Sequence, residues 1–72
     1  MTRAQARKKI NRIVRLMEEA RCEMEDMQDS FENDRFYDNM EEAKYSLDNT
    51  LDEFGKATSI YEEGGLDDEL EN

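Results

Sequence analysis

Apolar residues recur along the first part of the chain at the spacing of an amphipathic helix. They are Ala6, Ile10, Ile13, Met17, Ala20, Met24, Met27 and Phe31, separated by alternating gaps of 4 and 3. This seven-residue repeat is typical of a helix packed in a coiled coil. Thr2 and Gln5 have the spacing of a capping box, in which each side chain bonds the other residue's backbone N–H. The pattern therefore predicts a helix over residues 3–30.

A second apolar run with the same spacing follows. It consists of Phe36, Met40, Ala43, Leu47, Thr50, Phe54, Ala57 and Tyr61. It predicts a second helix over residues 35–62. If the first repeat continued unbroken, Asp34 and Asp38 would lie in the apolar seam, so we predict a turn over residues 31–35. Asn33 or Asp34 can cap the second helix. A single bent helix is the alternative, because residues 28–35 contain neither glycine nor proline.

These elements predict an all-α protein, an antiparallel two-helix hairpin over residues 1–63. Proline is absent from the 72 residues. Gly64 and Gly65 supply a stop for the second helix, because glycine adopts the left-handed conformation that closes many helices. We expect residues 64–72 to form a flexible acidic tail.

The apolar surface is wider than one partner helix can cover. Additional apolar side chains flank the two seams and would be buried if two hairpins packed into a four-helix bundle. A chain this short also gains from association, since its own core is small. We therefore expect a homodimer, with scattered exposed apolar residues as the alternative. The flanking residues are Val14, Leu16, Tyr37, Leu51 and Ile60.

Charge is divided unevenly along the chain. The net charge is -10, yet residues 1–17 carry +6 and the remainder carries -16. The hairpin would place the basic segment beside the acidic residues of 62–71, which can neutralise it. Alternatively, the basic side chains contact phosphate or an acidic partner. These basic residues are Arg3, Arg7, Lys8, Lys9, Arg12 and Arg15.

Acidic residues are dense around the predicted turn, where no basic block offsets them. Such a surface is most often a solvated helix face. It can also imitate a nucleic-acid backbone and occupy the basic groove of another protein. Small acidic inhibitors from phages and other mobile elements are an analogy for this activity. The candidate partner-binding residues are Asp26, Asp29, Glu32, Asp34, Asp38, Glu41 and Glu42.

The composition argues against catalysis. Histidine is absent, so the usual general base is missing, and the acidic residues match no calcium-loop spacing. We expect no enzymatic activity, no cofactor and no metal. No apolar run is long enough to span a membrane. One cysteine without an export signal indicates the cytoplasm.

The sequence thus favours a small acidic regulatory or inhibitory protein that binds a macromolecular partner, such as a nucleic-acid-binding enzyme. The alternatives are a nucleic-acid-binding hairpin that uses its basic first helix, and a structural subunit of a larger assembly.

Overall fold

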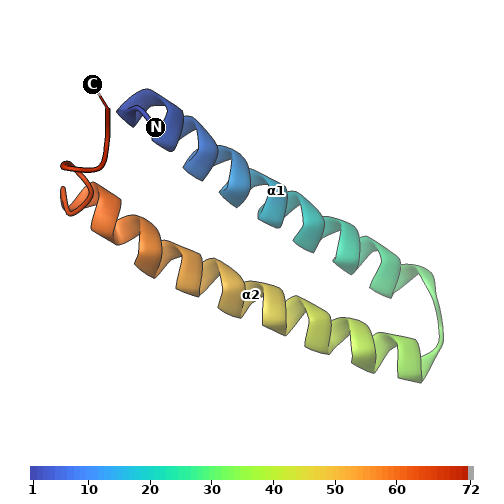
Figure 1. Cartoon of the computed structure of the whole chain (residues 1–72). Coiled ribbons are helices and arrows are strands. Elements are labelled where there is room, and N and C mark those ends of the chain that lie inside the picture. Colours follow the sequence, from blue (N-terminus) through green and yellow to red (C-terminus); the bar gives the residue numbers. More distant parts are fainter. Residues whose placement is uncertain (72) are drawn as a thin grey trace.

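The computed structural model describes residues 1–71 and contains two long helices joined by a short turn (Figure 1). Helix α1 spans Arg3–Ser30 and helix α2 spans Asp34–Glu62. They run antiparallel, so both chain termini lie at one end and the turn lies at the other. The hairpin measures 52 × 17 × 13 Å. The predicted all-α hairpin is confirmed, and the single bent helix is excluded by the turn at residues 31–33.

The helix ends follow from local chemistry. The capping box of α1 is formed: the backbone N–H of Gln5 donates to Thr2 Oγ1 at 3.1 Å, and that of Thr2 donates to Gln5 Oε1 at 3.0 Å. Of the two candidate caps for α2, Asn33 serves, accepting from the backbone N–H of Phe36 at 2.9 Å. The rings of Phe31 and Phe36 meet edge-on with centroids 5.2 Å apart, which closes the turn.

The contact line between the helices differs from the predicted heptads. Through the buried and half-buried residues it follows, on α1, Ala6, Ile10, Val14, Met17, Arg21, Met24 and Gln28 and, on α2, Phe36, Met40, Lys44, Leu47, Leu51, Phe54 and Thr58. The predicted seam positions Ala20, Ala43 and Tyr61 are half-buried beside this line. Both lines have gaps of 4, 4, 3, 4, 3 and 4, which average about 3.67 residues and match an 11-residue repeat.

The predicted seam positions Ile13, Met27, Phe31, Thr50 and Ala57 are exposed. A straight helix drifts by about 20° per heptad, so a strict seven-residue seam leaves the contact line after a few turns unless the helices supercoil. These helices run nearly straight (Figure 1). The neighbouring residues Gln28 and Thr58 therefore occupy the contact line instead.

The C-terminal segment turns back toward the start of α1. Gly64 has a φ of 83°, as expected for a residue that closes a helix, and the backbone N–H of Gly65 donates to Ile60 O at 2.8 Å. Leu66 and Leu70 then line the same hollow as Ala6. The backbone N–H of Glu71 donates to Met1 O at 2.9 Å. These contacts join the predicted tail to the first residues of the chain, and Asn72 lies outside the described residues.

The apolar core is shallow. Within residues 1–71, Ala6 is the one apolar residue in the buried class, at 7% exposure. The two other buried residues are polar, Gln28 at 3% and Lys44 at 9%. The two helices lie side by side in a single layer, so a hairpin alone leaves part of the surface of each helix uncovered. No helix of residues 1–71 is long and apolar enough to cross a membrane.

Candidate functional site

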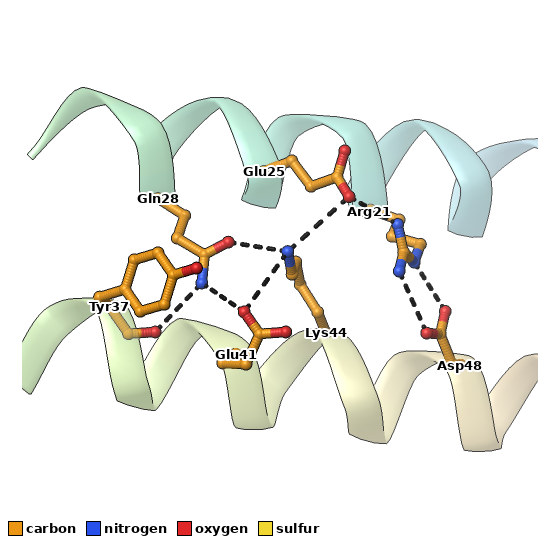
Figure 2. A network of polar contacts seen from close by, with 7 residues as sticks. All are labelled: Arg21, Glu25, Gln28, Tyr37, Glu41, Lys44 and Asp48. Carbon is orange, nitrogen blue, oxygen red and sulfur yellow. Dashed lines mark hydrogen bonds and ion pairs between the residues drawn. The ribbon is translucent and has the colours of Figure 1, made fainter.

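A polar network joins the helices in the half of the hairpin nearer the turn (Figure 2). Lys44 Nζ donates to Gln28 Oε1 at 2.7 Å, and Gln28 Nε2 donates to Glu41 Oε2 at 2.8 Å and to Tyr37 O at 3.2 Å. Carboxylates of Glu25 and Glu41 each lie 3.7 Å from Lys44 Nζ. No buried side-chain polar atom in the described chain lacks a partner. The network therefore satisfies two polar side chains that a coiled-coil seam would leave unpaired.

An arginine clamp adjoins this network. Arg21 donates to Asp48 through Nε at 2.7 Å and Nη2 at 3.2 Å, and to Glu25 through Nη1 at 2.8 Å. The hydrogen bonds from Arg21, helped by its positive charge, hold the pKa of Asp48 below its ordinary value. The same bonds raise the pKa of Arg21 above its ordinary value. Two parallel bonds fix the relative position of the helices, because a guanidinium matches a carboxylate in only a few orientations.

The predicted acidic residues lie at the turn end of the hairpin, and one of them differs from the others in the contacts that it makes. Glu41 belongs to the polar network. The others are exposed and form no ion pair within residues 1–71. They are Asp26, Asp29, Glu32, Asp34, Asp38 and Glu42. We call the seven residues together the acidic turn end.

The predicted basic residues lie at the opposite end of the hairpin. Arg3 pairs with Asp67, and the N-terminal amine lies 3.8 Å from Glu71. These contacts match the predicted proximity of the basic start and the acidic tail. The other five basic residues are exposed and form no ion pair within the described part of the chain: Arg7, Lys8, Lys9, Arg12 and Arg15. Most of the basic segment is thus not neutralised by direct contact.

The five flanking apolar residues divide into two groups. Val14 and Leu51 are half-buried and belong to the contact line of the hairpin itself. Leu16 and Tyr37 are each 48% exposed, and Ile60 is 50% exposed. Only the second group leaves large apolar surface available to another molecule.

The two broad faces of the hairpin differ in character. One bears the polar network, and helical spacing of about 100° per residue puts Ile13, Leu16 and Met27 of α1 on the other side. Phe31, which follows the end of α1, lines a hollow together with Met27. On α2 that side bears small residues, Ala43, Ser46, Thr50 and Ala57. We call these eight residues the open face. Two hollows lie along the open face. One of about 450 Å³ is lined by Met27 and Phe31, and one of about 310 Å³ is lined by Ile13 and Ala57.

No described group of histidine, cysteine, aspartate and glutamate residues could hold a metal ion. The thiol of Cys22 is free and exposed. Sequence reasoning missed Arg21, Gln28, Lys44 and Asp48, because charged and amide residues do not register as contact positions in an apolar pattern. The signal that finds Gln28 and Lys44 is the 11-residue spacing, which places each of them four residues after a methionine.

Comparison of the chain with protein-family models, with curated proteins and with solved structures gave no match.

Proposed function

We propose that this chain is a small acidic regulatory or inhibitory protein that binds a macromolecular partner through the acidic turn end. The observation that carries the proposal is the set of six exposed carboxylates without an ion pair in residues 1–71. The basic segment occupies the half of α1 that lies farther from the turn, in a hairpin 52 Å long. At 0.15 M ionic strength the Debye length is about 8 Å, so the basic segment cannot screen the acidic turn end.

The placement of charge on α1 supports a role outside the hairpin. The first turn of α1 contains no acidic residue and its last turn contains no basic residue. Arg3 lies at the positive end of the helix dipole, whereas Asp29 lies at its negative end. Both placements oppose the dipole and lower the stability of the isolated helix. A charge pattern that stabilises neither end of its helix is typical of a binding surface.

The chemistry of the acidic turn end fits a cationic groove. Carboxylates that project from two helices and the connecting turn form a compact anionic surface, and nucleic-acid-binding proteins present the complementary field. We therefore infer that the partner is a nucleic-acid-binding protein whose groove this surface occupies, as in the inhibitors of phages and mobile elements. The free thiol of Cys22 supports a reducing compartment such as the cytoplasm.

Affinity capture with matched charge variants tests the proposal. The acidic variant replaces Asp26, Asp29, Asp38 and Glu42 by the corresponding amides, and the basic variant replaces Lys8, Arg12 and Arg15 by Gln. We expect the wild-type chain and the basic variant to retain the same nucleic-acid-binding protein and the acidic variant to lose it. Loss of the partner with the basic variant alone would contradict the proposal.

A second candidate, direct nucleic-acid binding, rests on the basic stripe of α1. Lys8, Arg12 and Arg15 are spaced by 4 and 3 residues, so they share the side of α1 that faces away from α2. They form no ion pair in residues 1–71. Phosphate contacts made by such side chains would be strongly weakened by salt.

Fluorescence anisotropy with labelled duplex DNA and duplex RNA separates the two candidates. The first predicts weak binding by the intact chain at 0.15 M salt, because the overall charge is -10 and repels a polyanion. Tight binding that is lost when Arg7, Lys8, Arg12 and Arg15 become Gln would favour the second.

We further propose that the chain forms a homodimer by packing two hairpins into a four-helix bundle. The exposed apolar side chains Leu16, Met27 and Phe31 support this arrangement, at 48%, 49% and 55% exposure. A sedimentation mass that stays at one chain at micromolar concentration would contradict it.

A further inference from the structure

We propose that the open face is the interface between two copies of this chain and that the two hairpins stack in opposite directions. Each turn then lies at the end of the bundle where its partner has both termini. This inference rests on the proposed dimerisation and adds the surface that is buried and the orientation of the copies.

The accessible surface shows that a single hairpin is incompletely covered. The chain exposes 5932 Å², whereas a compact protein of 8.6 kDa exposes about 4,700 Å². The excess of roughly 1,200 Å² is comparable with the surface of about 800 Å² that each partner contributes to a standard interface. The radius of gyration of 16.3 Å likewise exceeds the value of about 11 Å expected for a compact chain of this length. A second copy supplies the missing layer.

The side chains on the two broad faces indicate which face is buried in the dimer. The opposite face is crossed by the Arg21–Asp48 clamp and by the network around Lys44 (Figure 2). Burying those exposed carboxylates would cost their hydration. The open face has large apolar side chains on α1 and small ones on α2, with an apolar hollow near each end. Lys9 and Arg35 also line these hollows, and such long basic side chains can bury their stems in an interface while the charged ends stay in water.

The charges of the turn and of α1 favour one orientation. If the hairpins pointed the same way, the two acidic turn ends would lie side by side and repel each other. In the opposite orientation, a two-fold axis perpendicular to the long axis stacks α1 on α1 of the partner, antiparallel. The basic first half of each α1, including Lys9 and Arg12, then lies beside the acidic second half of the other, including Glu23. Unlike charges at the edge of an interface favour this alignment.

The opposed dimer leaves the proposed partner-binding residues exposed. Helical spacing places Asp26 and Asp29 on the outer side of α1 and Asp38 on the outer side of α2, away from the open face. Because each hairpin is 52 Å long, the bundle would present two acidic turn ends separated by approximately that length. The dimer would thus be able to engage two partner molecules or two grooves of one assembly.

Spin labels at the turn test the orientation. The Glu32→Cys, Cys22→Ser variant carries a nitroxide at an exposed turn residue, and sedimentation of the labelled protein establishes its mass. We expect a dimer with a label separation near the 52 Å length of the hairpin. A dimer with labels within about 20 Å, the spacing of neighbouring helices plus side chains, would overturn the orientation and leave the proposed dimer intact. A monomer would overturn both.

Substitution within and outside the open face tests the surface. Leu16 lies near the midpoint of α1, so in the opposed dimer it packs close to Leu16 of the other copy. Leu16→Glu is expected to lower the dimer affinity at least tenfold, whereas Tyr45→Glu, on the outward side of α2, leaves it unchanged. A Leu16→Glu dimer as tight as the wild type would overturn the assignment of the open face.

Discussion

Gln28 on α1 and Lys44 on α2 are buried against each other, and Lys44 Nζ donates a hydrogen bond of 2.7 Å to Gln28 Oε1. They take places on the contact line that apolar residues hold over much of the remaining hairpin. A polar pair of this kind fixes the helices in one register, because any shift would leave the ammonium group without its acceptor.

Removing one member of this pair should cost more than removing both. Gln28→Ala leaves the Lys44 ammonium without its shortest hydrogen bond, and we expect a loss of about 1–3 kcal/mol in the free energy of unfolding. The double variant Gln28→Leu, Lys44→Leu fills the same space with apolar groups and should lose less. Urea denaturation of the single and double variants measures the difference. Equal losses would show that the pair does not hold the register.

The Arg21–Asp48 clamp should make stability depend on pH. The pKa of Asp48 is depressed in the folded chain, so its contribution is present above the ordinary aspartate pKa of about 3.9 and is lost as pH falls through the folded value. The wild type should therefore lose more stability between pH 7 and pH 2.5 than Asp48→Asn does. Thermal unfolding of both proteins at the two pH values provides the comparison, which also cancels the effect of the other carboxylates.

Loss of the first helix cap should destabilise the hairpin. Thr2→Ala removes the acceptor of the Gln5 backbone N–H and should cost about 1 kcal/mol. Ser59→Ala is the control, because the hydroxyl of Ser59 bonds only to Gly55 O within its own helix and lies outside the open face. Chemical denaturation should show a lower midpoint for the first variant alone; a lower midpoint for both would point to a general loss of hydroxyl contacts.

Neutralising single carboxylates at the turn should have opposite effects on the two helices. Asp29 lies at the C-terminal end of α1, where it opposes the dipole, so Asp29→Asn should raise the melting temperature. Asp34 lies in the first turn of α2, where it favours the dipole, so Asp34→Asn should lower it. Both changes should weaken partner binding if the acidic turn end is the contact surface. Circular dichroism melts and capture yields together separate the effect on stability from the effect on binding.

Much of the fold could be predicted from apolar spacing and capping residues. The helices, the turn and the Thr2–Gln5 box all follow from local patterns. The contact line could not be predicted as well, because the alternation of 4 and 3 fits a heptad and an 11-residue repeat almost equally over a few turns. The choice between them depends on whether the two helices supercoil, which only their packing determines.

The candidate site was partly predictable for a similar reason. Exposed carboxylates at the turn and basic residues beside the tail follow from where the hairpin reverses. The pairing of Arg21 with Asp48, 27 residues apart, requires the relative rotation of the helices. Neutralisation by the acidic tail was one of two alternatives for the basic segment. The tail pairs with Arg3, whereas Lys8, Arg12 and Arg15 form no ion pair in residues 1–71.

The most direct test of the proposed function is competition for the groove of the captured partner. A fluorescently labelled nucleic acid is bound to the purified partner, and its anisotropy is followed as the wild-type chain or the acidic variant is added. The wild type should release the label in proportion to its occupancy, and the acidic variant should not. If the wild-type chain binds the partner while the nucleic acid stays bound, the acidic turn end does not occupy the groove and the proposed mechanism is wrong.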